Sequence, residues 1–191
     1  MASRRARLGI CGRRGDSVKS KLMLTVLVSL LLLLAPQTPA CEPPTCDPVE
    51  VHDIYMRGWE AAREAARVGG SPMSLAPVDL AIARLERLAA GAHGPAEISM
   101  YVLRAAADAA RDEREAMALF LAHAVDLERI QLAGGQPGAP GITAHEAAGD
   151  LWLRVRRYDE ARRAYEHARS VVGSTALIEI GLSRVNDALR R

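Results

Sequence analysis

The sequence predicts an all-α protein, and three observations support this. The chain is rich in Ala, Leu and Arg, contains a single Phe and has few runs of β-branched residues, a composition that favours helix. Residues that start and stop helices alternate along the chain, with apolar residues at helical spacing between them. In residues 149–172, small and aromatic residues recur at intervals that suit two packed helices.

The first forty residues have the organisation of an export signal. Residues 22–35 form a continuous apolar run, which is shorter than the roughly 18 residues that a membrane-spanning helix needs. Lys19 and Lys21 precede this run, and a polar segment that ends in Ala40 follows it. We therefore expect residues 1–40 to be a signal peptide cleaved after Ala40, with an uncleaved membrane anchor as the alternative.

Removal of this leader would reverse the charge of the protein. The whole chain has a formal net charge of +2, whereas residues 41–191 hold 18 Arg against 22 Asp and Glu and contain no Lys. The basic character belongs to the leader, so the sequence offers no argument for nucleic-acid binding. The residues that remain, 41–191, suffice for one domain with a hydrophobic core, and we place this domain at residues 48–191.

Residues 41–47 form a tether rich in Cys and Pro, and two interpretations of it remain open. An export signal that ends directly before Cys41, with the small Ala40 at its end, resembles that of a bacterial lipoprotein and implies lipidation of Cys41. Alternatively, Cys41 and Cys46 form a disulfide, which an oxidising compartment permits. Either outcome predicts an envelope protein that is lipid-anchored, periplasmic or secreted.

Capping residues delimit the helices of the domain. Pro48 and Pro95 suit the first position of a helix, Asp112 opens another, and Thr143 with Glu146 has capping-box spacing. The expected helices span residues 48–68, 77–90, 95–111, 113–132, 144–156, 158–172 and 175–189.

Two Gly/Pro-rich linkers interrupt these helices. Residues 69–76 and 133–141 contain too many helix-breaking residues to continue a helix. The second linker is longer than a normal turn between helical repeats, so we expect it either to project as a loop or to separate two sub-bundles.

The clearest pattern lies in residues 142–175. The small and aromatic residues that form this pattern are Gly149, Trp152, Tyr158, Ala161, Tyr165 and Ala168. This stretch resembles a tetratricopeptide repeat, whose consensus has a Gly, an aromatic residue, a Tyr, an Ala, a second aromatic residue and an Ala at these six places. The earlier helix pairs match that consensus poorly.

The resemblance implies antiparallel helical hairpins stacked as a short solenoid with a C-terminal capping helix; an irregular helical bundle is the alternative. One repeat cannot bury its own apolar face, and roughly three are needed. In the family, outward positions of the first helix of each repeat line a groove for a protein or peptide. The resemblance carries these positions onto Thr143, Glu146, Asp150 and Leu153.

The sequence indicates no catalytic residue, metal ligand set or cofactor. His145-Glu146 begins like a zinc-protease helix, but Gly149 stands where the second histidine is needed. Arginines 154, 156, 157, 162 and 163 cluster beside acidic residues at helical spacing, which indicates solvated ion pairs more than an anionic-partner surface. We expect a non-catalytic, exported scaffold that binds a protein or peptide. The alternatives are a membrane-anchored, self-associating helical protein and an enzyme with a dispersed site.

Overall fold

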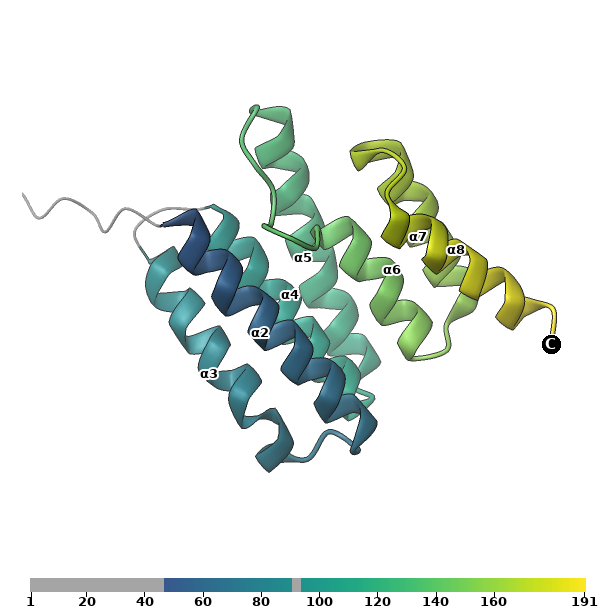
Figure 1. Ribbon diagram of the computed structural model, residues 1–191, viewed down its shortest axis with the longest axis horizontal. Helices are drawn as coiled ribbons and strands as arrows, with labels where there is room; N and C mark the ends of the chain where they lie inside the picture. Colours follow the sequence, from purple (N-terminus) through teal and green to yellow (C-terminus); the bar gives the residue numbers. More distant parts are fainter. Residues whose placement is uncertain (1–46, 91–93) are drawn as a thin grey trace, which may run out of the picture. The chain divides into compact units, whose positions relative to one another are not determined.

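A computed structural model describes residues 47–90 and 94–191, and these residues form seven α-helices and no strand. The helices are α2 (Pro48–Arg67), α3 (Pro72–Ala89), α4 (Pro95–Arg111), α5 (Arg114–Ala133), α6 (Ala144–Arg154), α7 (Tyr158–Val172) and α8 (Ala176–Leu189). The all-α prediction is confirmed (Figure 1). The leader, its cleavage site at Ala40 and both tether cysteines, Cys41 and Cys46, lie outside the described residues. None of the helices described here is long and apolar enough to cross a membrane.

The first linker is shorter than the sequence suggested, because α3 begins at Pro72 and not at residue 77. The side chain of Ser71 accepts a hydrogen bond from the backbone N–H of Ser74, and Pro72 occupies the first helical position, where no N–H is needed. Pro77 lies inside the helix and cannot donate to the carbonyl of Met73. Met73 is 87% exposed, so water can bind that carbonyl.

Asp112 has a different role from the expected one. It does not cap the start of α5; it ends α4 in the left-handed conformation, with φ of 61°. An aspartate tolerates this conformation better than most residues because its short polar side chain can bond locally. Its carboxylate accepts from the Arg114 guanidinium at 2.9 Å.

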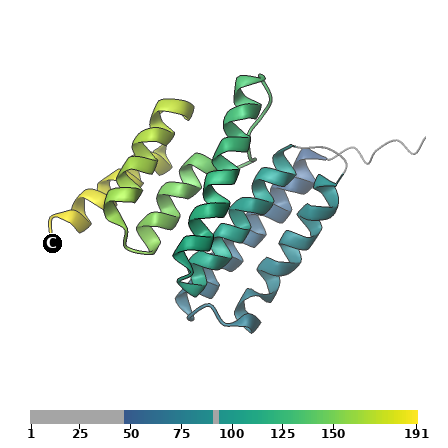
Figure 2. The same cartoon turned by 180° about the vertical axis from the view of Figure 1, so that it is seen from behind.

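Successive helices pack in a simple order. Helices α2 and α3, α4 and α5, and α6 and α7 form antiparallel pairs, and the first helices of neighbouring pairs also touch, α2 with α4 and α4 with α6 (Figures 1 and 2). Helix α8 packs against α6 and α7. Within the described part of the chain, the backbone of each helix lies beside only those one or two places away in this order, and the side chain of Arg154 at the end of α6 additionally reaches Trp59 of α2.

The buried apolar side chains form two clusters. The larger one runs from α2 to α6 and is built mostly from small and branched aliphatic residues, with Tyr55 and Trp59 among them. The smaller one lies between α7 and α8 and contains Tyr165 and Ile178. Trp152 of α6 packs against both clusters, so α6 joins the two parts of the core.

The ring of Tyr165 fills a space that two glycines leave open. A Cβ atom added at Gly149 of α6 or at Gly181 of α8 would overlap this ring. Tyr165 is 4% exposed, and burial raises its pKa well above the usual value, so the hydroxyl stays protonated. Of the other repeat positions, Ala161 and Ala168 are fully buried, whereas Trp152 and Tyr158 are half-buried.

The substitution Gly149→Ala tests this close packing. Because Gly181 confines the ring on its other side, Tyr165 cannot retreat, and we expect the variant to lose about 1–3 kcal/mol of unfolding free energy. Urea denaturation followed by circular dichroism measures this loss. Gly134→Ala is the matched control: its φ is −82° and an added Cβ makes only ordinary contacts. Equal stability of the two variants would contradict the packing argument.

The second linker is exposed over residues 133–137, and its second half then folds back onto α5 and α2. It does not divide the core, since Ala139 belongs to the larger cluster. The fully buried carboxylate of Glu128 accepts hydrogen bonds from the backbone N–H of Ala139 at 2.9 Å and from that of His145 at 3.2 Å. The imidazole Nδ1 of His145 lies 2.7 Å from the same carboxylate. A side chain at Gly138 would collide with Glu128, which explains the glycine there.

Helix α2 holds the end of this linker. The Tyr55 hydroxyl donates to the carbonyl of Ile142 at 2.9 Å. Burial, followed by the charges of Glu128 and Glu146, raises the pKa of Tyr55, so the hydroxyl remains a donor. The second half of the linker, through Ala139 and Ile142, therefore packs against the larger core cluster and leads directly into the start of α6.

Candidate functional site

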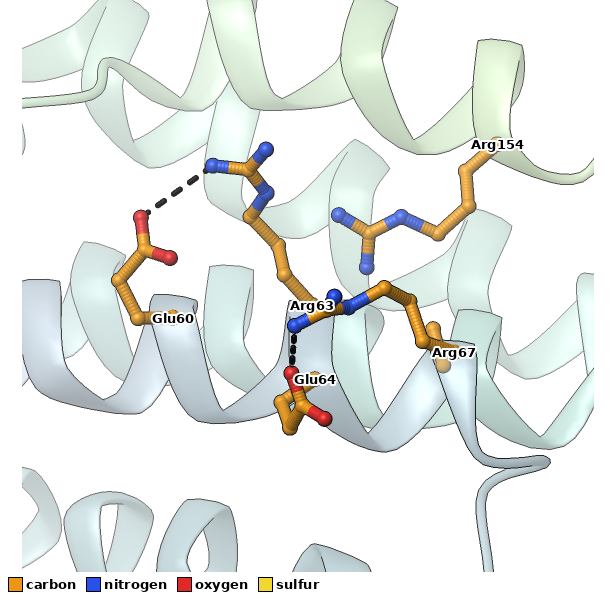
Figure 3. Close-up of a pocket in the computed structure, with 6 residues that line it drawn as sticks. Glu60, Arg63, Glu64, Arg67 and Arg154 are labelled. Atoms are coloured by element: carbon orange, nitrogen blue, oxygen red, sulfur yellow. Dashed lines mark hydrogen bonds and ion pairs between the residues drawn. The ribbon is translucent and has the colours of Figure 1, made fainter.

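A pocket of about 510 Å³ lies where α2 faces the end of α6. Arginine and glutamate side chains line most of it: Glu60, Arg63, Glu64, Arg67 and Arg154, with Ala66 (Figure 3). The first four come from the polar face of α2, and Arg154 is the last residue of α6. The pocket thus joins residues about 90 positions apart in the sequence.

Each of the two α2 arginines in the pocket pairs with a glutamate one turn earlier. Arg63 lies 3.3 Å from the Glu60 carboxylate, and Arg67 pairs with Glu64. All four side chains are more than half exposed, so these pairs add little stability. Their role in the pocket is to place two guanidinium groups at its rim.

Arg154 lies deeper than the other two arginines. Its guanidinium stacks over the buried ring of Trp59, with 5.7 Å between the guanidinium carbon and the ring centre, a favourable cation–π contact. One nitrogen, Nη2, donates to Asp150 at 3.2 Å. The other, Nη1, is buried and has no hydrogen-bond partner among the described residues.

The surroundings of Arg154 disfavour its charge. Burial lowers the pKa of this guanidinium, the charge of Asp150 opposes this effect, and the weaker influence of the neighbouring Arg63 charge lowers the pKa further. A guanidinium stays protonated in proteins even so. A carboxylate or phosphate oxygen that reached the buried Nη1 would satisfy this donor and reduce the repulsion between Arg154 and Arg63.

The four residues that the sequence placed in a groove do not share one surface environment in the structure. Thr143 and Glu146 form the expected capping box at the start of α6. Glu146 is only 6% exposed and also accepts from the Thr175 hydroxyl at 2.6 Å, so it fixes the start of α8. Leu153 packs against the smaller core cluster. Of these four residues, Asp150 is connected to the pocket, because its carboxylate accepts a hydrogen bond from Arg154.

The arginines of the turn between α6 and α7 are mostly paired, as the charge pattern indicated. Arg157 and Arg163 approach Glu160, and Arg162 approaches Asp159. Arg156 adopts a left-handed conformation, with φ of 62°. Of this sequence cluster, only Arg154 enters the pocket.

Sequence reasoning missed Arg63, Arg67 and Trp59 as neighbours of Arg154. The alternation of Glu and Arg along α2 is visible in the sequence but is typical of any solvated helix face. No local pattern indicates which helix that face meets. Among the residues that the structure covers, no group of three or more His, Cys, Asp or Glu side chains is placed to hold a metal ion.

Comparison with known proteins gives no relative for this chain. No protein-family model matches it, no curated protein is similar to it, and no solved structure matches its fold.

Proposed function

We propose that the protein is an exported, envelope-tethered helical scaffold that binds an acidic segment of a partner protein in the arginine pocket. The leader and the tether cysteines support export, as argued from the sequence. The lining of the pocket supports an acidic ligand, since it offers guanidinium donors and has no arrangement typical of catalysis.

The packing order supports a solenoid resembling tetratricopeptide repeats. Repeat proteins of this kind are quasi-one-dimensional, because each unit contacts only its neighbours. The backbone packing of the helices follows that rule, and only the side chain of Arg154 reaches from the third pair to the first among the described contacts. Helices α2, α4 and α6 are the first helices of successive pairs. The pocket lies on α2 and α6, the helix type that lines the groove in that family.

The main support for the proposal is that Nη1 of Arg154 is buried without a hydrogen-bond partner among the described residues. A buried donor without a partner costs about 1–3 kcal/mol, and burial of Arg154 disfavours its charge, with a smaller contribution from the like charge of Arg63. An anion that accepts a hydrogen bond from this unpaired donor removes that cost, which favours binding. An acidic side chain or a chain-terminal carboxylate has the planar, two-oxygen geometry that a guanidinium recognises.

Titration of a fluorescein-labelled hexaglutamate peptide against the protein tests the pocket. We expect binding at low ionic strength that weakens with added salt, because the charges are partly exposed. Arg154→Gln removes a charged donor worth about 1.5–3 kcal/mol, which corresponds to more than a tenfold loss of affinity. Fluorescence anisotropy measures both effects.

Arg129→Gln is the matched control for this experiment. Arg129 lies on α5 and pairs with Asp126 at the surface, so the change in net charge is the same but the pocket is untouched. Equal losses for both variants would mean that the peptide responds only to overall charge, and the proposed pocket would be abandoned.

The non-reduced intact mass of the protein from its native host tests the localisation. We expect a species that begins at Cys41, either in the membrane fraction with added acyl mass or in the soluble fraction lighter by two hydrogen atoms, as a disulfide requires. A species that keeps its leader would contradict export with cleavage and would favour the membrane-anchored alternative.

A further inference from the structure

A second polar site lies on the other side of α6, around the ring of His145. The side chain of this histidine is completely buried, as is that of its partner Glu128. The Nδ1 atom lies 2.7 Å from the Glu128 carboxylate, which cannot donate when ionised, so Nδ1 carries the proton of that bond. The opposite ring nitrogen, Nε2, is buried and has no hydrogen-bond partner among the described residues.

The imidazole of His167 faces this ring from α7. The two ring centres lie 5.3 Å apart, and the ring planes are tilted by 39°. His167 is exposed to solvent. The Nε2 atom of His145 is itself buried, and Glu128 of α5 occupies the Nδ1 side of the ring, so an ion would enter from the His167 side.

This separation suits two imidazoles that bind one metal ion. Zinc–nitrogen bonds of about 2.0–2.1 Å at a tetrahedral angle place two ring centres roughly 5 Å apart. Histidines that bind metals also commonly donate their other ring N–H to a carboxylate, which fixes the ring and makes the free nitrogen a better ligand. Glu128 already holds His145 in this way.

We propose that His145, through Nε2, and His167 bind a divalent transition-metal ion of the Zn²⁺, Ni²⁺ or Cu²⁺ class, with water completing the coordination. Imidazole nitrogen is a ligand that these ions favour. Glu128 acts as a positioning residue that does not touch the metal. The ion would link α6 to α7 next to the carboxylate that links α5 to the linker. This site is independent of the arginine pocket.

Titration of the metal-free full chain with Zn²⁺ tests the proposal by calorimetry. We expect one ion per chain at this site, and His167→Ala should weaken its binding about 100-fold or more, since loss of a mere supporting carboxylate already costs roughly 10–100-fold. His167 is exposed, so the variant should keep its fold, which circular dichroism verifies. His123→Ala removes an exposed histidine of α5 and should leave this binding unchanged.

Nitrogen-15 spectra of the histidine rings identify the ligand atoms directly. We expect Zn²⁺ to shift Nε2 of His145 and one ring nitrogen of His167 together, and to leave the Nδ1 proton of His145 in place. This readout also separates the site from any binding by the cysteines. Unchanged ring signals at millimolar Zn²⁺, or equal affinity of His167→Ala and the parent chain, would overturn the proposal.

Discussion

The arrangement of the helices depends on the hydrogen bonds that the buried carboxylate of Glu128 accepts. A buried charge is expensive unless hydrogen bonds satisfy it. Here the two oxygens accept from the Ala139 and His145 backbones and from the His145 ring. The donors come from the linker and from the first turn of α6, so one carboxylate on α5 fixes both. Without it, three buried donors would lose their acceptor, at about 1–3 kcal/mol each.

The position of α6 then determines the rest of the C-terminal part. Its Gly149 provides half of the space for Tyr165, and Gly181 of α8 provides the other half. Its Glu146 holds the Thr175 hydroxyl at the start of α8. At its other end, Arg154 reaches Trp59 of α2 and completes the arginine pocket. The candidate binding site is therefore a consequence of how the linker and α6 are anchored.

The sequence predicted local structure well because helix ends are encoded locally. The capping box at Thr143 and Glu146 and the prolines at helix starts placed most boundaries within one or two residues. The start of α3 was missed because a Gly/Pro-rich run reads as a linker, although Ser71-Pro72 is itself a start signal. Asp112 was misassigned because an aspartate between two helices can cap the second or end the first, and the sequence does not distinguish them.

The long-range features could not be predicted from the chain. In the sequence, Glu128 looks like an ordinary charged residue on a solvated helix, because the residues next to it do not indicate that the linker folds back and covers it. Arg63 and Arg67 likewise look like ordinary surface ion pairs until α6 places Arg154 beside them. The spacing of Gly149, Tyr165 and Ala168 did indicate one tight helix pair, because small and aromatic positions complement each other within a single hairpin.

Native-state hydrogen exchange at the amides of Ala139 and His145 tests most directly whether Glu128 anchors the linker. Amides in the stable core exchange only when the protein opens on a scale approaching global unfolding, whereas those of a loose loop exchange almost freely. The account predicts core-like protection at both amides in the parent protein and a marked loss of it in Glu128→Gln. Rapid exchange at Ala139 in the parent, or unchanged protection in the variant, would contradict the account.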